Sequence, residues 1–435
     1  MDNLAFARAQ MGLSLAFHIV FAVIGVGMPL LMVISEAAWL RTGERTYLDL
    51  TRRWARGTVI LFAVGAVSGT VLSFELGLLW PRFMEYAGGI IGMPFSLEGF
   101  AFFLEAIFLG LYLYGWERLS GRAHVCAGVI VSVSGALSGA FVVTANAWMN
   151  TPAGFRVTES GAVDVAPFEA MFNPAAGAQV VHMLLAAYAA VGIAVAGVHA
   201  RLLLRQPTNA FHRRAFVIAL IVGMPAALLQ PLSGDWAGRV VAETQPAKLA
   251  ALEGQFVSES YAPLRIGGIP DVDAAETRYG LEIPGGLSLL GYGDPSAQVV
   301  GLNDIPRELW PPVVAVHLSF QIMVALGSWL ALLALWTLVL WWRGRLFDSP
   351  RYLRAMFLST ALGFVAIEAG WMVTELGRQP WIVQGVMRTS AAVTPMPGLL
   401  APFMLFTLIY IGLGAVVTVL IRQTVLATAP SAGTR

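Results

Sequence analysis

The sequence predicts an all-α membrane protein with nine transmembrane helices. The first observation behind this prediction is composition: 57% of the 435 residues are hydrophobic and only 12% are charged, whereas soluble proteins carry about 25% charged residues. The second is that long apolar runs recur along the chain, and a run of about 20 residues suffices for a helix to cross a bilayer. These observations exclude a disordered chain, a fibrous repeat and an ordinary soluble enzyme.

Nine apolar runs meet the length requirement. They are residues 12–40, 57–79, 95–116, 124–146, 177–203, 214–233, 312–342, 352–375 and 397–421. One long hydrophilic segment, acidic and rich in glycine and proline, separates the sixth run from the seventh, and segments of this length are usually functional or disordered. We therefore predict helices one to six in residues 1–233, a loop in residues 234–311, and helices seven to nine with a short tail in residues 312–435.

Basic residues predict the orientation of the chain. Arginines cluster in the segments that follow the first, third, fifth and seventh runs and in the C-terminal tail. Short loops rich in basic residues stay on the cytoplasmic side of a membrane. The N-terminus and the loop between helices six and seven are therefore predicted to lie outside, and the C-terminus in the cytoplasm.

The net charge and the cysteine content exclude some binding partners and some kinds of site. The net charge is +1, so nucleic acid is not an expected partner. The single cysteine, Cys126, allows neither an internal disulfide nor a cysteine-based metal motif. Lys248 is the only lysine among 27 basic residues. Taken alone, this rarity is explained by a codon bias towards arginine.

Ionisable side chains inside the spans are the candidate functional residues, because charge is costly in hydrocarbon. Several of them, together with one methionine, fall in the outer half of the predicted bundle. They are His18, Glu75, Glu98, Glu105, His182, Met323, Glu368 and Glu375. Glu98 and Glu105 are seven residues apart and share a helix face, as do Glu368 and Glu375. Others are expected at the membrane interfaces without a role: Glu36, His124, His199 and His212.

The residue types alone leave several functions open. Imidazole, thioether and carboxylate groups suit haem iron, and paired carboxylates suit a proton path. A methionine in an apolar helix is, however, usually core filler, and Glu98, Glu105 and Glu368 would also serve a proton-coupled transporter without haem. A haem-bearing electron conduit or sensor is a third alternative. Transporters often contain repeated halves, and the sequence shows no clear repeat.

Several segments resemble subunit I of cytochrome bd quinol oxidase. The most specific is the segment 370–381, GWMVTELGRQPW, whose GRQPW core is close to a family fingerprint. The others are 8–18, 98–105 (EGFAFFLE), 115–120 (GWERLS), 146–150 (NAWMN) and 248–253 (KLAALE). The resemblance implies a terminal oxidase of the bacterial cytoplasmic (inner) membrane that oxidises quinol and reduces O₂ to water with three haems.

The resemblance also implies the iron ligands. His182 and Met323 would be the axial ligands of a low-spin haem b. His18 and Glu375 would hold a high-spin haem b and a haem d, in either order. A second high-spin haem b in place of haem d would make the protein an all-haem-b, cyanide-insensitive variant.

Further residues receive roles from the same resemblance. Glu98 would lie beside the haem held by His18, as a ligand or a proton acceptor, and Glu105 would belong to a proton path from the cytoplasm. Arg378 would support a haem propionate, and Trp381 would pack between the high-spin haems.

The resemblance assigns Lys248 and Glu253 to the quinol site. Glu253 would accept a quinol proton and Lys248 would anchor a quinone oxygen; their spacing alone is typical of an exposed charge pair in a solvated loop. With quinol oxidised outside and protons for O₂ taken from the cytoplasm, the enzyme would generate proton motive force without a pump. Implied partners are ubiquinol or menaquinol, O₂, a homologous membrane subunit II and, in some members, a very small single-span subunit.

The sequence departs from the family at one informative position. Two residues before Met323, where the family commonly carries arginine, this chain has Gln321. Such an arginine would hold a propionate or stabilise the reduced low-spin haem. Its replacement therefore implies an altered haem potential or quinol affinity.

Overall fold

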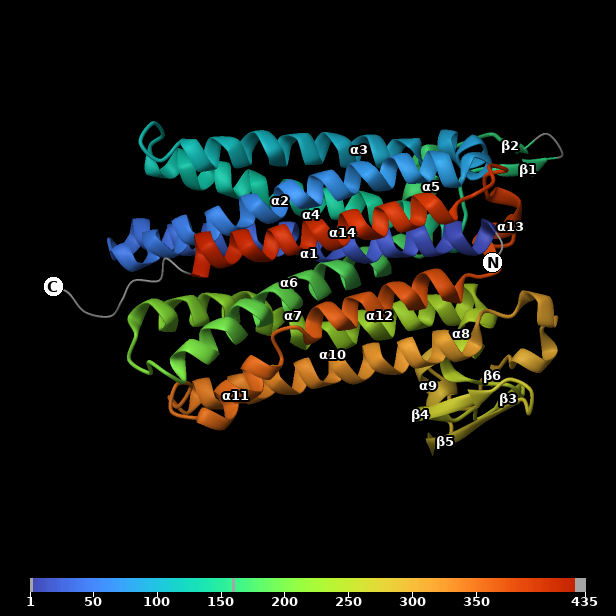
Figure 1. The fold of residues 1–435 in the computed structure, drawn as a ribbon. Coiled ribbons are helices and arrows are strands. Elements are labelled where there is room, and N and C mark those ends of the chain that lie inside the picture. The colour runs from blue at the N-terminus through green and yellow to red at the C-terminus, as the bar shows by residue number, and fades with distance from the viewer. Residues whose placement is uncertain (1–2, 159–160, 427–435) are drawn as a thin grey trace.

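The structure, a computed structural model, describes residues 3–158 and 161–426. Its long helices run side by side in one bundle with two halves (Figure 1). One half contains α1 to α4 and α14, and the other contains α6, α7 and α10 to α12. The long helices are α1 (Asn3–Thr42), α2 (Arg45–Leu79), α3 (Pro81–Tyr114), α4 (Gly121–Asn150), α6 (Ala176–Leu203), α7 (Ala210–Thr244), α10 (Val313–Trp342), α11 (Pro350–Leu358), α12 (Leu362–Gly377) and α14 (Leu400–Ile421).

Nine helical segments of the described residues are long and apolar enough to span a membrane, which confirms the predicted number of spans. Apolar runs in hydrocarbon must form helices, because a helix pairs nearly all of its own backbone groups. The starts of three helices are fixed by side chains that accept a hydrogen bond from the backbone N–H three residues later, namely Ser120, Asn209 and Ser349. Such capping satisfies donors that a helix leaves unpaired.

The eighth span differs from the prediction because it is interrupted between α11 and α12. Ser359 Oγ donates to the Ala355 carbonyl, and Thr360 Oγ1 donates to the Phe357 carbonyl. Hydroxyl side chains that bond to nearby carbonyls compete with regular helix. The break packs against α6 at Gly197, where an added Cβ would lie 3.1 Å from Thr360 Cβ.

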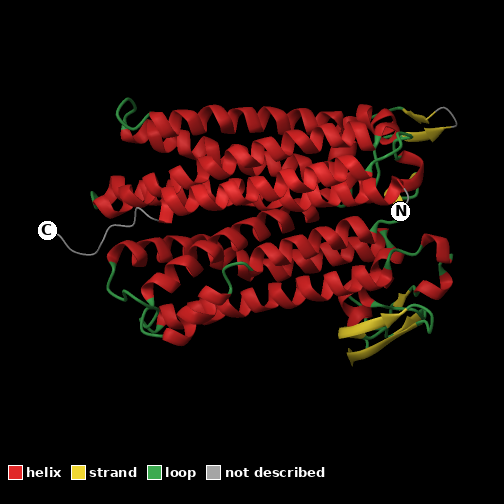
Figure 2. Cartoon of the chain, in the orientation of Figure 1, coloured by secondary structure: helices red, strands yellow, loops and turns green. Residues whose placement is uncertain are grey.

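The segment between the sixth and seventh spans is folded. Helix α7 continues to Thr244, past the predicted end at residue 233. The segment then forms short elements at one end of the bundle, where Figure 2 shows two-stranded sheets packed beside the helices. These elements are α8 (Pro246–Glu253), β3 (Glu259–Ser260), β4 (Leu264–Asp271), β5 (Glu276–Ile283), α9 (Gly286–Tyr292) and β6 (Gln298–Val299). An apolar cluster that includes Leu252, Phe256, Val316 and Val373 joins α8 to α10 and α12.

We call the end of the bundle that carries residues 245–312 the loop end. Helix α1 begins at this end, whereas α14 ends at the opposite end (Figure 1). The remaining short elements also lie at the loop end: β1 (Arg156–Thr158), β2 (Gly161–Val163), α5 (Pro167–Met171), β7 (Trp381–Val383), β8 (Met387–Arg388) and α13 (Thr389–Ala392). The start of α1 and the long loop therefore lie at the same end of the bundle. The membrane face at which each end lies stays a prediction.

Candidate functional site

His18 on α1 is supported by a serine on the neighbouring helix α2. Its Nδ1 lies 3.0 Å from Ser68 Oγ, and that hydroxyl donates its one proton to the carbonyl of Val64, 2.9 Å away. With the ring proton on Nδ1, the serine oxygen accepts from Nδ1–H and Nε2 is the nitrogen that can bind a metal. Gly69 gives the ring its space, since a Cβ there would lie 3.0 Å from His18 Cε1.

His182 on α6 repeats this arrangement. Its Nδ1 lies 3.0 Å from Ser233 Oγ of α7, and Ser233 donates to the carbonyl of Gln230. The Gln230 amide nitrogen lies 3.1 Å from His182 Nε2 and 3.3 Å from Nδ1, and it donates to the His182 carbonyl at 3.2 Å. Each histidine thus has a serine hydroxyl at Nδ1, and a hydrogen bond at Nδ1 of this kind fixes the tautomer and orientation of metal-binding imidazoles.

Met323 lies on α10, in the same half of the bundle as His182. Its thioether faces α12 at Gly370, where an added Cβ would lie 3.1 Å from Met323 Sδ. The glycine allows α12 to approach closely at this level. The sulfur is therefore held at a helix interface rather than exposed on the outside of the bundle.

Glu375, near the end of α12, is held by two donors. Asn146 of α4 donates to its Oε1, and Arg378 Nη2 donates to its Oε2 at 2.6 Å. Arg378 is only 2% exposed, and its Nε and Nη1 have no hydrogen-bond partner among the described residues. A buried guanidinium with unpaired donors is costly. These two donor atoms are placed to bind a further anionic group.

Lys248 on α8 is joined to Glu375 by a chain of amide side chains. Its Nζ donates to Asn150 Oδ1 at 2.7 Å, and Asn150 Nδ2 lies 3.2 Å from Asn146 Oδ1. Asn146 in turn donates to Glu375. Lys248 is buried, and this burial lowers its pKa to about 7, an effect that nearby Arg378 strengthens and Glu375 opposes.

Glu253 points to a different set of neighbours from those of Lys248. It is buried at the end of α8, which raises its pKa to about 7, while a hydrogen bond from the Arg265 backbone and the Arg265 charge oppose this rise. Its Oε2 has no partner within the residues that the structure describes. The interpretation of Lys248 and Glu253 as an exposed, solvated charge pair is therefore wrong, because the fold buries both and pairs each with other groups.

The two carboxylates of α3 lie on one face, as their spacing predicts. Glu105 is buried against α4, where a Cβ at Gly135 would lie 3.1 Å from its Oε1. Ser138 of the same helix donates to Glu98 at 3.4 Å.

Trp381 begins β7, three residues after Arg378, and its ring lies beneath the Arg388 guanidinium.

The structure buries several residues that the sequence interpretation placed at the interfaces. His124 Nδ1 lies 2.7 Å from Glu36 Oε1, and the Tyr112 hydroxyl donates to Glu36 Oε2 at 2.5 Å. His199 and His212 form a second buried contact, with 3.1 Å between their Nδ1 atoms. These side chains are buried near the ends of their helices, and their position at the membrane interfaces stays a prediction. A signal was present for Tyr112, which follows Glu105 by seven residues on the same face of α3.

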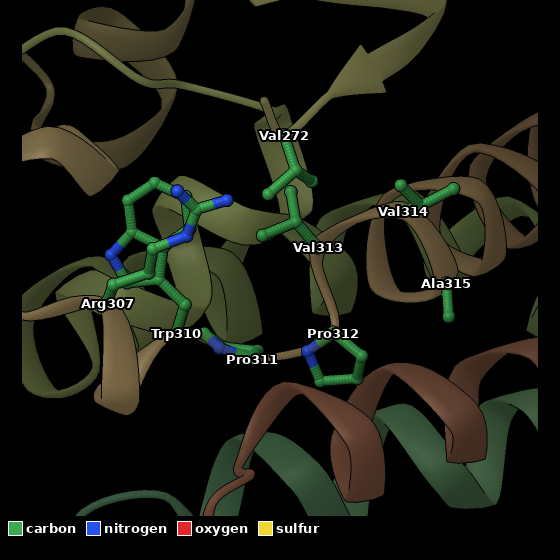
Figure 3. A pocket seen from close by; sticks show the side chains of 8 residues that line it. All are labelled: Val272, Arg307, Trp310, Pro311, Pro312, Val313, Val314 and Ala315. Atoms are coloured by element: carbon green, nitrogen blue, oxygen red, sulfur yellow. The ribbon is translucent and has the colours of Figure 1, made fainter. Parts of the chain in front are cut away.

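Two cavities flank the segment Trp310–Pro312, just before α10. Figure 3 shows the larger one, of about 560 Å³, with Arg307, Trp310 and valines of α10 in its lining. The smaller one, of about 330 Å³, extends to Gln379 and Pro380. Neither cavity is lined by a predicted site residue, although the smaller one borders the segment that follows Arg378.

A family model for cytochrome bd terminal oxidase subunit I matches residues 6–429. The chain belongs to the cytochrome bd oxidase subunit I family. Membership makes the protein a multi-pass membrane subunit of a quinol oxidase. It implies haem cofactors, quinol and O₂ as substrates and a subunit II partner.

Individual cytochrome bd proteins match along nearly their whole length. A putative cytochrome bd menaquinol oxidase subunit I of Bacillus subtilis (strain 168) is 36% identical over 424 residues, which cover 96% of this chain and 95% of that protein. The cytochrome bd-II ubiquinol oxidase subunit 1 of Escherichia coli (strain K12) is 30% identical, and the matched region covers 90% of this chain and 90% of that protein. The solved bd oxidase from Geobacillus thermodenitrificans superimposes with a TM-score of 0.91 at 38% identity, over 98% of this chain and 99% of that one.

Proposed function

We propose that this chain is the haem-bearing catalytic subunit of a bacterial inner-membrane oxidase that oxidises quinol at the outer face and reduces O₂ to water with cytoplasmic protons. The observation that carries the proposal is the pair of serine-supported histidines. Inside an apolar bundle, Nδ1 of each ring lies 3.0 Å from a serine hydroxyl, and an Nδ1–H donated to the serine leaves Nε2 to ligate iron. A proton-coupled transporter would use the carboxylates but would have no need of this arrangement.

The donor set fits the haems of the family. In our proposal His182 and Met323 hold the low-spin haem b, and His18 and Glu375 hold the high-spin haem b and the haem d, in either order, or a second high-spin haem b. When bound, the haems supply electron transfer from quinol and the binding of O₂. The two free donor atoms of Arg378 fit a propionate.

Lys248 and Glu253 are assigned to quinol, within the proposed quinol region 234–311. The Glu253 carboxylate can accept a hydroxyl proton of quinol, because its pKa of about 7 lies close to the operating pH. The Lys248 ammonium can donate to a quinone oxygen. The two side chains leave α8 on different sides, so a substrate that touches both must lie across this helix.

The orientation of the chain in the membrane determines where protons are released and taken up. With the loop end outside, quinol protons leave on the outer side, while Glu105 and Glu98 carry protons from the cytoplasm towards the site of O₂ reduction. Proton motive force then follows without a pump. Trp381 would pack between the high-spin haems, and a homologous subunit II would complete the membrane complex, with ubiquinol or menaquinol as the donor.

A visible spectrum of purified membranes tests the proposal directly. Membranes that contain this chain with its subunit II should show low-spin and high-spin haem bands after dithionite reduction, and O₂ uptake when quinol is added. A further band in the red region, typical of a chlorin, would identify haem d, and its absence with activity intact would identify an all-haem-b enzyme. Membranes without haem bands would exclude the oxidase and leave the transporter.

Replacing Lys248 with alanine should raise the quinol KM by about tenfold and leave the haem spectra unchanged. The expected factor corresponds to the loss of one charged hydrogen bond. The measurement is O₂ uptake against quinol concentration, together with the reduced spectrum. Arg156→Ala, at an exposed arginine of β1 that pairs with Asp164, is the control and should leave KM unchanged. Loss of a haem in the Lys248 variant would contradict the assignment to quinol.

A further inference from the structure

One edge of strand β4 is paired with side chains of α10 instead of with another strand. Its other edge pairs with β5. Gln321 Nε2 donates to the Arg265 carbonyl at 3.1 Å, and Gln321 Oε1 accepts from the Gly267 N–H at 2.8 Å. His317 Nε2 lies 3.2 Å from the Gly267 carbonyl. Gln321 therefore satisfies two of the backbone groups that an unpaired strand edge would otherwise leave open, and His317 lies beside a third.

His317 also reaches the end of α8. Its Nδ1 lies 2.7 Å from the carbonyl of Leu252, the residue before Glu253, and the ring is fully buried. An added Cβ at Gly254 would lie 3.5 Å from the same nitrogen. The ring is thus fixed between α8 and β4. It contacts the backbone next to Glu253 on one side and Gly267 on the other.

The amide of Gln321 matches this strand edge in a way that an arginine cannot. An amide side chain offers both a donor and an acceptor, whereas a guanidinium has five donors and no acceptor. Arginine at this position would leave the Gly267 N–H without its partner. Gln321 therefore holds the edge of β4 through both groups of its amide.

Both α10 side chains act on backbone that surrounds Glu253. The carboxylate is hydrogen-bonded by the backbone of Arg265 and lies in the field of its guanidinium. Gln321 holds the carbonyl of that same residue, and His317 holds the residue before Glu253. The charged group that acts on the carboxylate is Arg265 of β4, which also pairs with Glu282 of β5. The His317 ring of α10 lies against the backbone carbonyl of Leu252.

We propose that His317 and Gln321 are positioning residues for the Glu253 carboxylate: they fix α8 and β4 to the helix that carries Met323. The inference rests on the proposed role of Glu253 as the acceptor of a quinol proton. Neither side chain takes a proton or an electron itself. Their contribution is to keep the carboxylate at a constant place relative to α10 while quinol enters and leaves.

Three variants of the complete membrane enzyme test the proposal. Gln321→Met keeps the size of the side chain without its hydrogen bonds, and Gln321→Arg restores donors but no acceptor. His317→Asn keeps a donor for the Leu252 carbonyl and is too short to reach Gly267. We expect each Gln321 variant to lower kcat/KM for quinol by about fivefold to twentyfold, the effect of one or two lost hydrogen bonds, and His317→Asn to lower it less. Leu318→Ala, on the exposed side of α10, is the control.

Two readouts separate positioning from a general loss of structure. The Arg265 backbone bond holds the pKa of Glu253 down against the effect of burial. A Gln321 variant that loosens Arg265 should therefore move the acid limb of the kcat/KM profile to higher pH, while the dithionite-reduced spectrum stays unchanged. Amide hydrogen exchange in residues 265–267 should become faster in the same variants.

The outcomes distinguish this inference from the proposed function. Unchanged kcat/KM and an unchanged acid limb in Gln321→Met and His317→Asn would overturn the positioning role, even if Lys248→Ala raises the quinol KM. Full quinol oxidation by Glu253→Gln would instead overturn the role of the carboxylate itself. Loss of the low-spin spectrum in Gln321→Met without faster exchange at Gly267 would show that Gln321 serves the haem.

Discussion

Replacing His182 with alanine is expected to remove the low-spin haem absorbance and to lower quinol oxidase activity by more than about a hundredfold. Loss of a hydrogen-bond partner behind a metal ligand typically costs about tenfold to a hundredfold in metal affinity or activity, so loss of the ligand itself should cost more. Met323→Leu should have the same effect, because it keeps the side-chain volume and removes the sulfur. The measurements are the reduced-minus-oxidised spectrum and O₂ uptake with quinol.

Serine variants provide the graded comparison for this prediction. Ser233→Ala keeps the imidazole and removes the acceptor at Nδ1, so we expect a weakened low-spin signal and about a tenfold loss of activity. Ser96→Ala is the matched control, since that hydroxyl bonds to the Gly92 carbonyl of its own helix. A low-spin spectrum that survives in both His182→Ala and Met323→Leu would contradict the ligand assignment.

Replacing Arg378 with methionine is expected to remove the high-spin haem absorbance and nearly all oxidase activity. The guanidinium is the cation paired with Glu375, at 2.6 Å. Removal of one partner from a buried ion pair typically lowers the free energy of unfolding by about 3–5 kcal/mol. Because the Glu375 side chain is 31% exposed, we expect a loss at the lower end of this range, about 3 kcal/mol. Arg378→Lys keeps the charge but lacks the planar fork, and should retain part of the signal.

A nearby arginine supplies the control for Arg378. Arg388 lies over the Trp381 ring and is exposed, so Arg388→Met should leave the spectra and the O₂ uptake unchanged. The spectra of both variants should be recorded on detergent extracts matched for the amount of subunit. Full high-spin absorbance in Arg378→Met would show that Glu375 and the anionic group do not depend on this cation.

The membrane spans could be predicted from the sequence because their cause is local. A run of about 20 apolar residues has to form a helix in hydrocarbon, whatever surrounds it. Helix ends were less predictable: α7 continues to Thr244 because polar residues such as Asp235 and Arg239 pair along the helix at its loop end. The break before Leu362 depends on the Thr360 hydroxyl, which bonds to the Phe357 carbonyl, and on the close approach of α6 at Gly197.

The partners of the site residues could not be predicted, because they are distant in sequence. Asn150 is separated from Lys248 by 98 residues, and Asn146 from Glu375 by 229. The divergence of Lys248 and Glu253 was predictable in principle. Five residues along a helix correspond to a rotation of about 140°, so side chains at this spacing do not face one another. The resemblance drew attention to the pair, whereas helix geometry explains why their surroundings differ.

The burial of the single lysine has a practical consequence for chemical labelling. Lys248 is the only side-chain amine in the chain, and its pKa of about 7 leaves a large share of it unprotonated at neutral pH. The amine is thus intrinsically nucleophilic but shielded, being 4% exposed. An acylating reagent can modify this side chain only while α8 moves away from α4 and α12. The extent of acylation at residue 248 therefore measures how often this part of the protein opens, without any engineered probe.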